Sequence, residues 1–205
     1  MQLATDLPTR GPWTIERLFA ETGEDAVRRE IIDGWLYIDG QRVDDPYAEV
    51  AAESSRLYHG STVMALIIAL HEATSDLDGQ LITAPMDVAF GDRLLQPDVF
   101  WIPVRLPRDT HPIRTRPDLV VEVSSPSTRR HDLVRKRRVY EQSGVPEYWF
   151  VDLDAQRIEV YVLGEGDEPY PDPRLFGRGR TVTATALPGV TVEVDEILGP
   201  PDGIA

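Results

Sequence analysis

The chain has 205 residues, of which 41% are hydrophobic and 27% are charged, values typical of one soluble globular domain. It contains no cysteine, which excludes disulfide scaffolds, thiol catalysis, iron–sulfur clusters and cysteine-ligated zinc. The longest apolar run, residues 63–70, is too short to cross a bilayer, and the N-terminus lacks the pattern of a secretory signal. We therefore expect one cytoplasmic domain over residues 1–205 with no membrane partner.

The charge of the chain is unevenly distributed. The formal net charge is −14, and a uniformly acidic surface would repel nucleic acid. Residues 105–138, however, hold ten basic and four acidic residues. The arginines of this segment either contact phosphate groups or simply form the solvent-exposed surface of a helix and a loop. Charge alone favours the second interpretation.

The first half of the sequence predicts helices and strands in alternation. A short helix is expected over residues 13–20, and a hairpin over 30–38 turns at Asp33-Gly34, a strong hairpin signal. A long helix follows over 48–73. Strands are expected over 81–90 and 94–102, separated by a turn at Gly91-Asp92.

The second half continues the pattern. After a loop over 103–117, a strand is expected over 118–124 and a helix over 128–142, with Ser127 as its N-cap and Gly144 just beyond its end. Strands follow over 147–153 and 157–163, then a loop over 164–179 and weaker strands over 181–186 and 190–194. This order predicts an α/β fold with a mixed sheet and helices on its faces.

Two carboxylates lie in or beside apolar strands. Glu122 interrupts the run LVVEV, which is apolar on both alternating faces and therefore predicts a central strand. A buried carboxylate must be paired, protonated or metal-bound, so Glu122 either forms a salt bridge with a nearby arginine or binds a metal. Asp98 follows Pro97 at the start of the preceding strand, where it is either a turn residue or a second metal ligand. Hard cations such as Mg²⁺ favour such oxygen donors.

Lys136 is the only lysine beside twenty arginines. At 100° per residue it falls within the apolar stripe of the predicted helix, between Tyr140 and Val139. An i,i+4 pair with Asp132 is the alternative explanation, but that pair does not account for an inward position. The pattern favours a functional ammonium group at this position.

Residues 116–152 resemble a known family. This stretch is similar to the signature of domain of unknown function 820, the Uma-type branch of the PD-(D/E)XK restriction-endonuclease-like superfamily. The hairpin at 30–36, His59 and the segment 96–99 fall in the expected order, so the resemblance covers residues 13–163 and leaves 164–205 as an extension. It implies a core of helix, three strands, helix and strand, with an N-terminal β-hairpin and extra C-terminal strands.

The resemblance also implies an active site. Asp98 would be the aspartate of the PD element and Glu122 the acidic residue of the E-x-K element. Ser124 stands where the superfamily has lysine, and Lys136 on the following helix is the matching position in this family. Asp98, Glu122 and the carbonyl of Val123 would hold Mg²⁺ or Mn²⁺, and Lys136 would orient the attacking water or stabilise the transition state.

Further residues complete the hypothesis. Glu30 is either an additional acid near the metal or an exposed residue ahead of the hairpin. His59 either positions Glu30, contacts phosphate, or is a partly buried helix histidine. A basic edge would track the nucleic-acid backbone, formed by Arg129, Arg130, Arg137 and Arg138.

The sequence thus predicts a metal-dependent endonuclease that hydrolyses phosphodiester bonds of DNA, with a homodimer favoured if both strands are cut. Two alternatives remain open. One is a catalytically inactive nuclease-fold module that binds nucleic acid or a protein, with Glu122 and Lys136 as a buried ion pair; Ser124 favours it. The other is a phosphodiesterase for small substrates, which the acidic surface favours.

Overall fold

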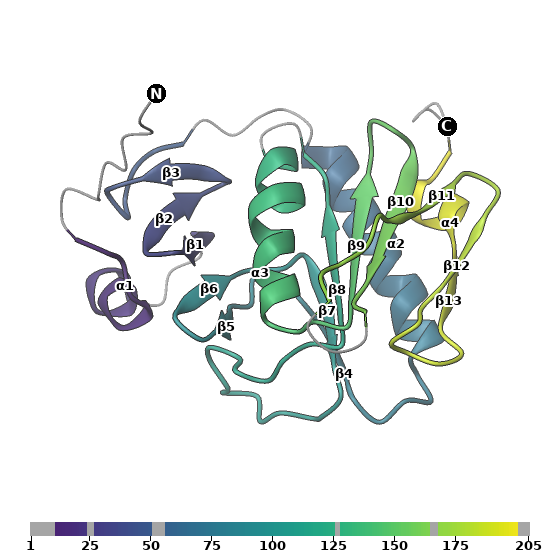
Figure 1. The fold of residues 1–205 in the computed structure, drawn as a ribbon, viewed down its shortest axis with the longest axis horizontal. Coiled ribbons are helices and arrows are strands. Elements are labelled where there is room, and N and C mark those ends of the chain that lie inside the picture. Colours follow the sequence, from purple (N-terminus) through teal and green to yellow (C-terminus); the bar gives the residue numbers. More distant parts are fainter. Residues whose placement is uncertain (1–10, 24–26, 51–55, 126–127, 165–167, 201–205) are drawn as a thin grey trace.

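The structure is a computed structural model that describes residues 11–23, 27–50, 56–125, 128–164 and 168–200. Its central sheet lies between helix α2 (Arg56–Ala73) on one face and, on the other, helix α3 (Arg137–Gln142) with the π-helical turn η1 (His131–Lys136) that precedes it (Figure 1). In spatial order the strands of this sheet are β11 (Arg174–Gly177), β10 (Arg157–Val162), β9 (Glu147–Asp152), β8 (Leu119–Val123), β7 (Val99–Ile102) and β4 (Gln80–Thr83).

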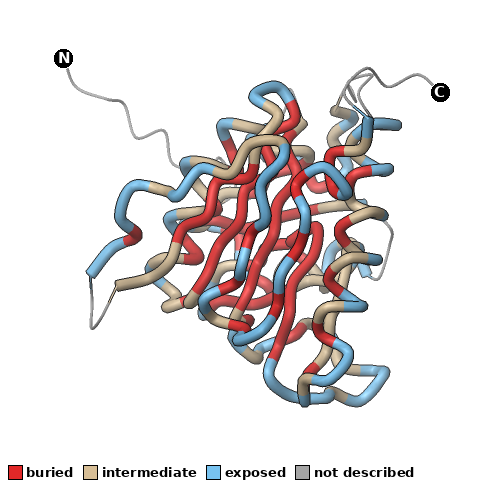
Figure 2. The backbone as a smooth tube through the Cα atoms, turned by 90° about the vertical axis from the view of Figure 1, so that its right-hand side faces the viewer, coloured by how far each residue is buried: buried red, intermediate tan, exposed pale blue. Residues whose placement is uncertain are grey.

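Strands β8 and β9 form the parallel pair of the central sheet, with Glu122 opposite Phe150. Parallel neighbours need a crossover connection, and η1 and α3 provide it. All five residues of β8 and all six of β9 are buried, and Figure 2 shows buried strands running through the middle of the molecule. The predicted central strand, covered on both faces, is therefore confirmed.

A second sheet lies beside the first. Its spatial order is β3 (Gln41–Val43), β2 (Trp35–Ile38), β1 (Arg29–Ile32), β6 (Arg93–Leu95) and β5 (Val88–Phe90). The predicted hairpin is confirmed, because Ile32 pairs with Trp35 across a two-residue turn in which Asp33 and Gly34 both have positive φ. Helix α1 (Ile15–Thr22) packs on this sheet; it starts later than predicted because Thr14 caps it by accepting a hydrogen bond from the Arg17 amide.

The prediction of two long strands over 81–90 and 94–102 is wrong. Each region forms two short strands that belong to different sheets: β4 and β7 pair in the central sheet, whereas β5 and β6 pair in the second. Pro85 and Pro97 lie at the two interruptions, where a residue without a backbone N–H cannot continue a ladder. Between β4 and β7 the chain therefore crosses from one sheet to the other twice, and Asp98 lies at the second of these crossings.

Other boundaries also differ from the prediction. Residues 48–50 are not helical, residues 51–55 and Ser127 lie outside the described residues, and the helix predicted over 128–142 contains the η1 turn. Strand β11 lies within the predicted loop over 164–179; it begins directly after Pro173 and pairs with β10. The chain then forms β12 (Thr181–Thr183), β13 (Thr191–Glu193) and the unpredicted helix α4 (Val194–Leu198).

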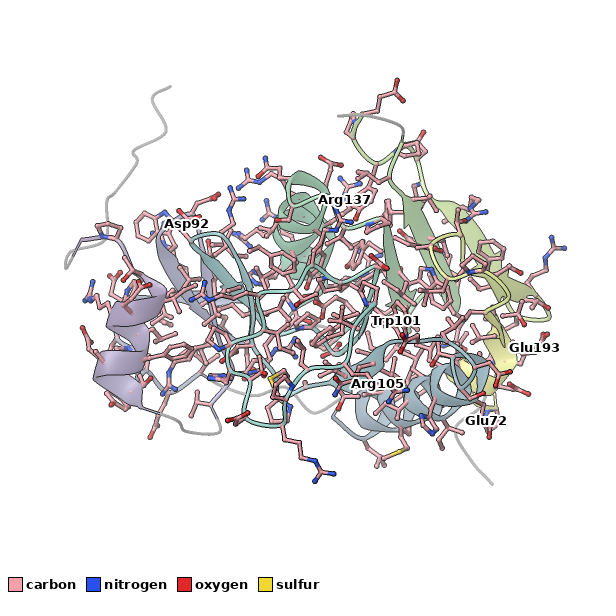
Figure 3. All side chains as sticks on the ribbon, turned by 90° about the horizontal axis from the view of Figure 1, so that it is seen from below. Glu72, Asp92, Trp101, Arg105, Arg137 and Glu193 are labelled. Atoms are coloured by element: carbon pink, nitrogen blue, oxygen red, sulfur yellow. The ribbon has the colours of Figure 1, made fainter. Side chains whose placement is uncertain are left out.

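The two faces of the central sheet have separate cores. Leu66 and Leu70 of α2 pack against β7, β8 and β9 together with residues from β12, β13 and α4. On the other face, Val139 and Tyr140 of α3 pack against Phe100, and this second core extends to the second sheet. Figure 3 shows Arg137 on the α3 side of the molecule and Glu72 on the α2 side. No described helix is both long enough and apolar enough to span a bilayer.

Candidate active site

Three carboxylates converge between the two sheets on the side of α3. Glu122 lies on β8 and alternates with Val121 and Val123, which pack on the α2 side. Asp98 immediately precedes β7, and Glu30 lies on β1. All three are buried, with 3% exposure for Glu30 and Asp98 and 1% for Glu122. The expectation that Glu30 is an exposed strand residue is therefore wrong.

Lys136 joins these carboxylates from the helix. Its side chain is 1% exposed, and Nζ lies 2.8 Å from Glu122 Oε1 and 2.9 Å from Glu30 Oε1. The i,i+4 pair with Asp132 also forms, at 3.3 Å, but Asp132 is itself buried within the same cluster. The only lysine therefore points inward, as predicted. Its i,i+4 pair with Asp132 forms together with its contacts to Glu122 and Glu30, so the two interpretations of Lys136 do not exclude each other. Tyr140 completes the arrangement by donating a 2.5 Å hydrogen bond to Glu122 Oε1.

The π-helical turn explains why more of the helix faces inward than α-helical periodicity predicts. The amide of Arg137 donates to the carbonyl of Asp132, a bond between residues five apart. With this spacing, His131 and Lys136 share the buried face, whereas an α-helix would separate them by more than a quarter turn. His131 and Asp132 are consequently 2% and 3% exposed.

His131 contacts Glu30, whereas the sequence suggested this contact for His59. His131 Nε2 lies 2.8 Å from Glu30 Oε2, and the Gln96 amide donates to Glu30 Oε1 at 3.1 Å. His59 approaches Asp98 instead, with 3.9 Å between Nε2 and Oδ1. The prediction that His59 positions Glu30 is therefore wrong, because His59 lies on α2 and reaches the opposite end of the cluster.

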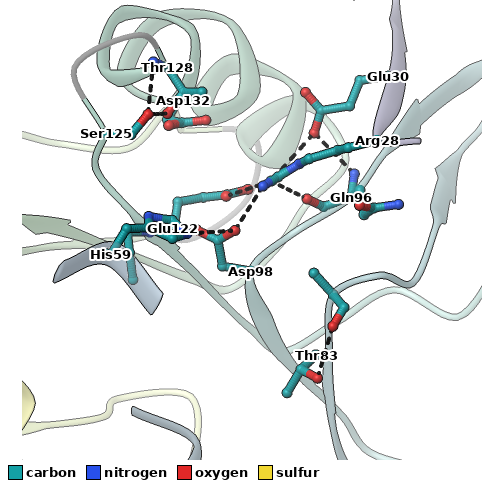
Figure 4. Close-up of polar contacts among 12 residues, drawn as sticks. Arg28, Glu30, His59, Thr83, Gln96, Asp98, Glu122, Ser125, Thr128 and Asp132 are labelled. Atoms are coloured by element: carbon teal, nitrogen blue, oxygen red, sulfur yellow. Dashed lines mark hydrogen bonds and ion pairs between the residues drawn. The ribbon is translucent and has the colours of Figure 1, made fainter. Parts of the chain in front are cut away.

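Arg28 lies between the carboxylates and was not predicted (Figure 4). Its Nη1 is 2.9 Å from Asp98 Oδ1, and its Nη2 is 3.5 Å from Glu122 Oε2 and 2.5 Å from the Gln96 carbonyl oxygen. With 26% of its side chain exposed, Arg28 lies at the mouth of the cluster, as does His59 with the same exposure. Its position two residues before Glu30 could have indicated that Arg28 lies in the cluster, because residues i and i+2 of a strand share a face.

The cluster contains more acidic than basic groups. Burial, together with the neighbouring charges of Asp98 and Asp132, raises the pKa of Glu122 to about 8, although Lys136 and Arg28 act in the opposite direction. Burial also raises the pKa of Asp132. A further positive charge at Glu122 would favour its ionised form.

Glu30 and Asp98 behave differently from Glu122. Burial opposes ionisation of Glu30, but Lys136, the His131 hydrogen bond and Arg28 hold its pKa well below the usual range. Burial opposes ionisation of Asp98, but Arg28, His59 and Lys136 together lower its pKa, as does the Val123 amide, which donates to Oδ2 at 2.8 Å. The cluster therefore keeps two firmly ionised carboxylates, Glu30 and Asp98, and two that carry a proton more readily, Glu122 and Asp132.

Asp98 and Glu122 fit a hard divalent cation. Glu122 Oε2 is buried and has no hydrogen-bond partner within the described residues, and the Arg28 guanidinium lies between this oxygen and Asp98. No group of three or more histidine, aspartate and glutamate side chains forms a ready metal cage in the described part of the chain. Mg²⁺ commonly uses only one or two protein carboxylates, with water and phosphate oxygens completing its shell.

Ser124 has a structural contact of its own. Its hydroxyl oxygen accepts a 2.9 Å hydrogen bond from the Leu153 amide just after β9, and its side chain is buried. Position 124 therefore ties the ends of β8 and β9 together. The cation beside Glu122 comes from Lys136 on the helix instead.

The four arginines of the predicted basic edge have different environments. Arg129 pairs with Asp152 at 2.6 Å, and exposed Arg138 pairs with Asp33. Arg137 lies over the Tyr161 ring, 5.1 Å from its centroid. Arg130 is exposed. In the described structure, no side chain of these four arginines contacts the carboxylate cluster.

The architecture of the chain matches that of a solved structure. A solved structure from Anabaena variabilis, described as a "putative nuclease belonging to DUF820", matches with a TM-score of 0.68 at 16% identity, over 91% of this chain and 98% of that chain. At this identity, the similarity establishes a shared fold. No curated protein matches the chain.

The family assignment comes from the sequence as a whole. Residues 17–195 match the Uma2 family, described as "Putative restriction endonuclease". The chain belongs to this family, which confirms the resemblance stated from residues 116–152.

Proposed function

We propose that the protein is a metal-dependent endonuclease, a hydrolase that cleaves phosphodiester bonds of DNA. The observation that carries the proposal is the convergence of Asp98, Glu122, Glu30 and Lys136 from four separate segments on one buried cluster with a partly open mouth. Buried titratable groups with strongly shifted pKa values are typical of active sites. Family membership supports the same reaction class.

Each residue has a proposed role. Asp98 and Glu122, with the carbonyl of Val123, would hold Mg²⁺ or Mn²⁺. A bound divalent cation supplies Lewis-acid polarisation of the phosphodiester and a more acidic water. Lys136 would stabilise the negative charge that develops on the phosphate or orient the attacking water, while Glu30, which His131 contacts, holds the ammonium group in place.

The substrate path and assembly belong to the same proposal. We propose that Arg129, Arg130, Arg137 and Arg138 contact the nucleic-acid backbone, which requires Arg129 and Arg138 to exchange their present acidic partners for phosphate. We also propose that the chain functions as one domain in the cytoplasm, and that it pairs as a homodimer if both DNA strands are cut. The shared core of α2, the central sheet, β12, β13 and α4 supports the single domain.

A second candidate is a binding module without catalysis. The internal satisfaction of Lys136 by Glu122, Glu30 and Asp132 favours it, as does the structural hydrogen bond of Ser124. Such a module would retain its ion pairs and bind nucleic acid or a protein without needing a divalent cation.

One experiment distinguishes the two candidates. Plasmid and single-stranded DNA are incubated at low salt with Mg²⁺ or Mn²⁺ and wild type, Glu122→Gln, Lys136→Met, or the exposed control Glu72→Gln. We expect metal-dependent cleavage that falls roughly 100-fold or more in both site variants and is unchanged in the control. Absence of cleavage together with absence of calorimetric Mg²⁺ and Mn²⁺ binding by wild type would leave the binding module.

A further inference from the structure

A pocket of about 380 Å³ lies beside the carboxylate cluster, between α1 and two loops. One wall is Phe19 of α1, whose ring centroid lies 5.2 Å from that of His111 on the loop before β8. Met86 and Val27 add further apolar surface. The pocket is thus wide enough for a planar ring and offers aromatic surface on which such a ring can stack.

Polar groups converge on the same pocket. Asp87 receives a hydrogen bond from Gln96 Nε2 at 3.2 Å and lies 3.0 Å from His111 Nε2. In the described structure, the side-chain amide of Gln96 uses one N–H for Asp87, so its side-chain oxygen Oε1 and its second Nε2–H remain available. Arg29 and Arg108 also line the pocket. Hydrogen-bonding edges beside an aromatic wall are the features with which proteins hold unstacked nucleobases.

The pocket is held in shape by the backbone. The Ile113 amide donates to the Asp87 carbonyl at 2.9 Å, and the Ala89 amide donates to the Ile113 carbonyl at 2.7 Å. These bonds fix the loop that carries His111 against the start of β5. The Asp87–His111 pair is therefore positioned before any ligand arrives, which lowers the entropic cost of binding.

Gln96 connects the pocket to the carboxylate cluster. Its amide donates to Glu30 and its carbonyl accepts from Arg28, whereas its side chain reaches Asp87. Val27 and Arg29, which line the pocket, flank Arg28 at the mouth of the cluster. The pocket and the cluster are consequently adjacent, with Gln96 contacting groups in both.

We propose that this pocket binds the base of the nucleotide whose phosphate enters the carboxylate cluster. Its occupant is an unstacked nucleobase of single-stranded or locally opened DNA, which stacks on Phe19 and His111 and hydrogen-bonds to Asp87 and Gln96. The inference rests on the proposed nuclease function and adds to it a preference for unpaired substrate at the cleavage position.

An abasic scan tests the inference. Fluorescence anisotropy measures binding of a labelled single-stranded 12-mer in Ca²⁺ at low salt, with one base removed at each position in turn. We expect wild type to lose about tenfold in affinity at one position, as stacking on one aromatic side chain predicts. Phe19→Ala and His111→Ala should bind intact and abasic strands equally at that position, and exposed Asp76→Asn should behave as wild type.

The outcomes separate this inference from the function on which it rests. A flat abasic profile for wild type, or a profile that keeps its minimum in both variants, overturns the base pocket even if the protein cleaves DNA. Failure of wild type to bind any strand overturns the nuclease proposal as well. His111 is exposed, so its variant should fold even if Phe19→Ala weakens α1, and thermal unfolding monitored by circular dichroism checks this.

Discussion

The two faces of the central sheet differ in what they bury. On the α2 side, Val121 and Val123 of β8 pack in a cluster of apolar side chains. On the α3 side, Glu122 of the same strand meets Lys136 and Tyr140. One face of β8 therefore stabilises the fold, whereas the other carries the charged site. The free energy gained by burying the apolar face offsets the cost of burying charged groups on the other.

The largest expected effect comes from breaking the charged face. Lys136→Met leaves Glu122, Glu30 and Asp132 buried without their ammonium partner, and we expect a loss of about 3–5 kcal/mol in the free energy of unfolding. Glu122→Gln should cost less, and the double variant should cost less than the sum of the two. Urea unfolding of all four proteins measures the coupling. Additive costs would mean that Lys136 and Glu122 do not act as a pair.

The apolar face should respond in stability alone. Leu66 is fully buried on α2, so Leu66→Ala should cost about 2–5 kcal/mol through the cavity it leaves. Its calorimetric affinity for Mg²⁺ should equal that of wild type. Ile68→Ala on the exposed side of the same helix is the matched control and should change stability by less than about 0.5 kcal/mol. A weakened metal affinity in Leu66→Ala would contradict the separation of the two faces.

Arg28 lies at the mouth of the carboxylate cluster and tests how the charged side of the sheet binds a cation. Its guanidinium lies between Asp98 and Glu122, the space that a cation bridging these residues would need. Removing it in Arg28→Met should therefore increase Mg²⁺ affinity about tenfold, or about 1.4 kcal/mol, in calorimetry without substrate. Arg105→Met, at a side chain that is 72% exposed, is the control. Unchanged or weaker binding in Arg28→Met would show that the guanidinium does not compete with the ion.

A smaller, pH-dependent effect is expected at the end of β9. Although burial opposes it, Arg129 and the Ala155 amide stabilise the Asp152 carboxylate and lower its pKa below 3.8. A lowered folded-state pKa contributes stability above the unfolded value, and this contribution disappears as pH falls through the folded value. Asp152→Asn should thus cost about 1 kcal/mol at pH 7 and nearly nothing at very low pH.

Urea unfolding from pH 7 downward measures this difference. The neighbouring exposed Asp154→Asn should show no such dependence. A cost for Asp152→Asn that is equal at all pH values would mean that the Arg129 ion pair does not stabilise the fold.

Strong local signals allowed part of this structure to be predicted. The Asp33-Gly34 turn, the buried β8 strand and the inward Lys136 each follow from the residues near them in sequence. The strand interruptions at Pro85 and Pro97 were missed because an apolar run does not reveal which sheet each half joins. That depends on pairing with distant strands, such as β4 with β7.

The site was predictable to a similar extent. Asp98 and Glu122 were found because acidic residues in or beside apolar strands need an explanation, whereas Glu30 was singled out through the family resemblance. Arg28 and His131 were missed, since an arginine beside a strand and a histidine on a basic helix look ordinary. Their role depends on the approach of the second sheet and on the hydrogen-bonding pattern of η1, neither of which has a clear sequence signal.

The η1 turn has a consequence for comparing relatives. A π turn corresponds to one residue inserted into an α-helix whose two ends remain anchored. Deleting one residue between His131 and Lys136 would therefore restore α-helical winding while both ends of the helix keep their orientation. A homologous chain without the turn would need its lysine one position earlier to reach the same carboxylate. The number of residues between Glu122 and Lys136 therefore indicates whether the helix contains a π turn.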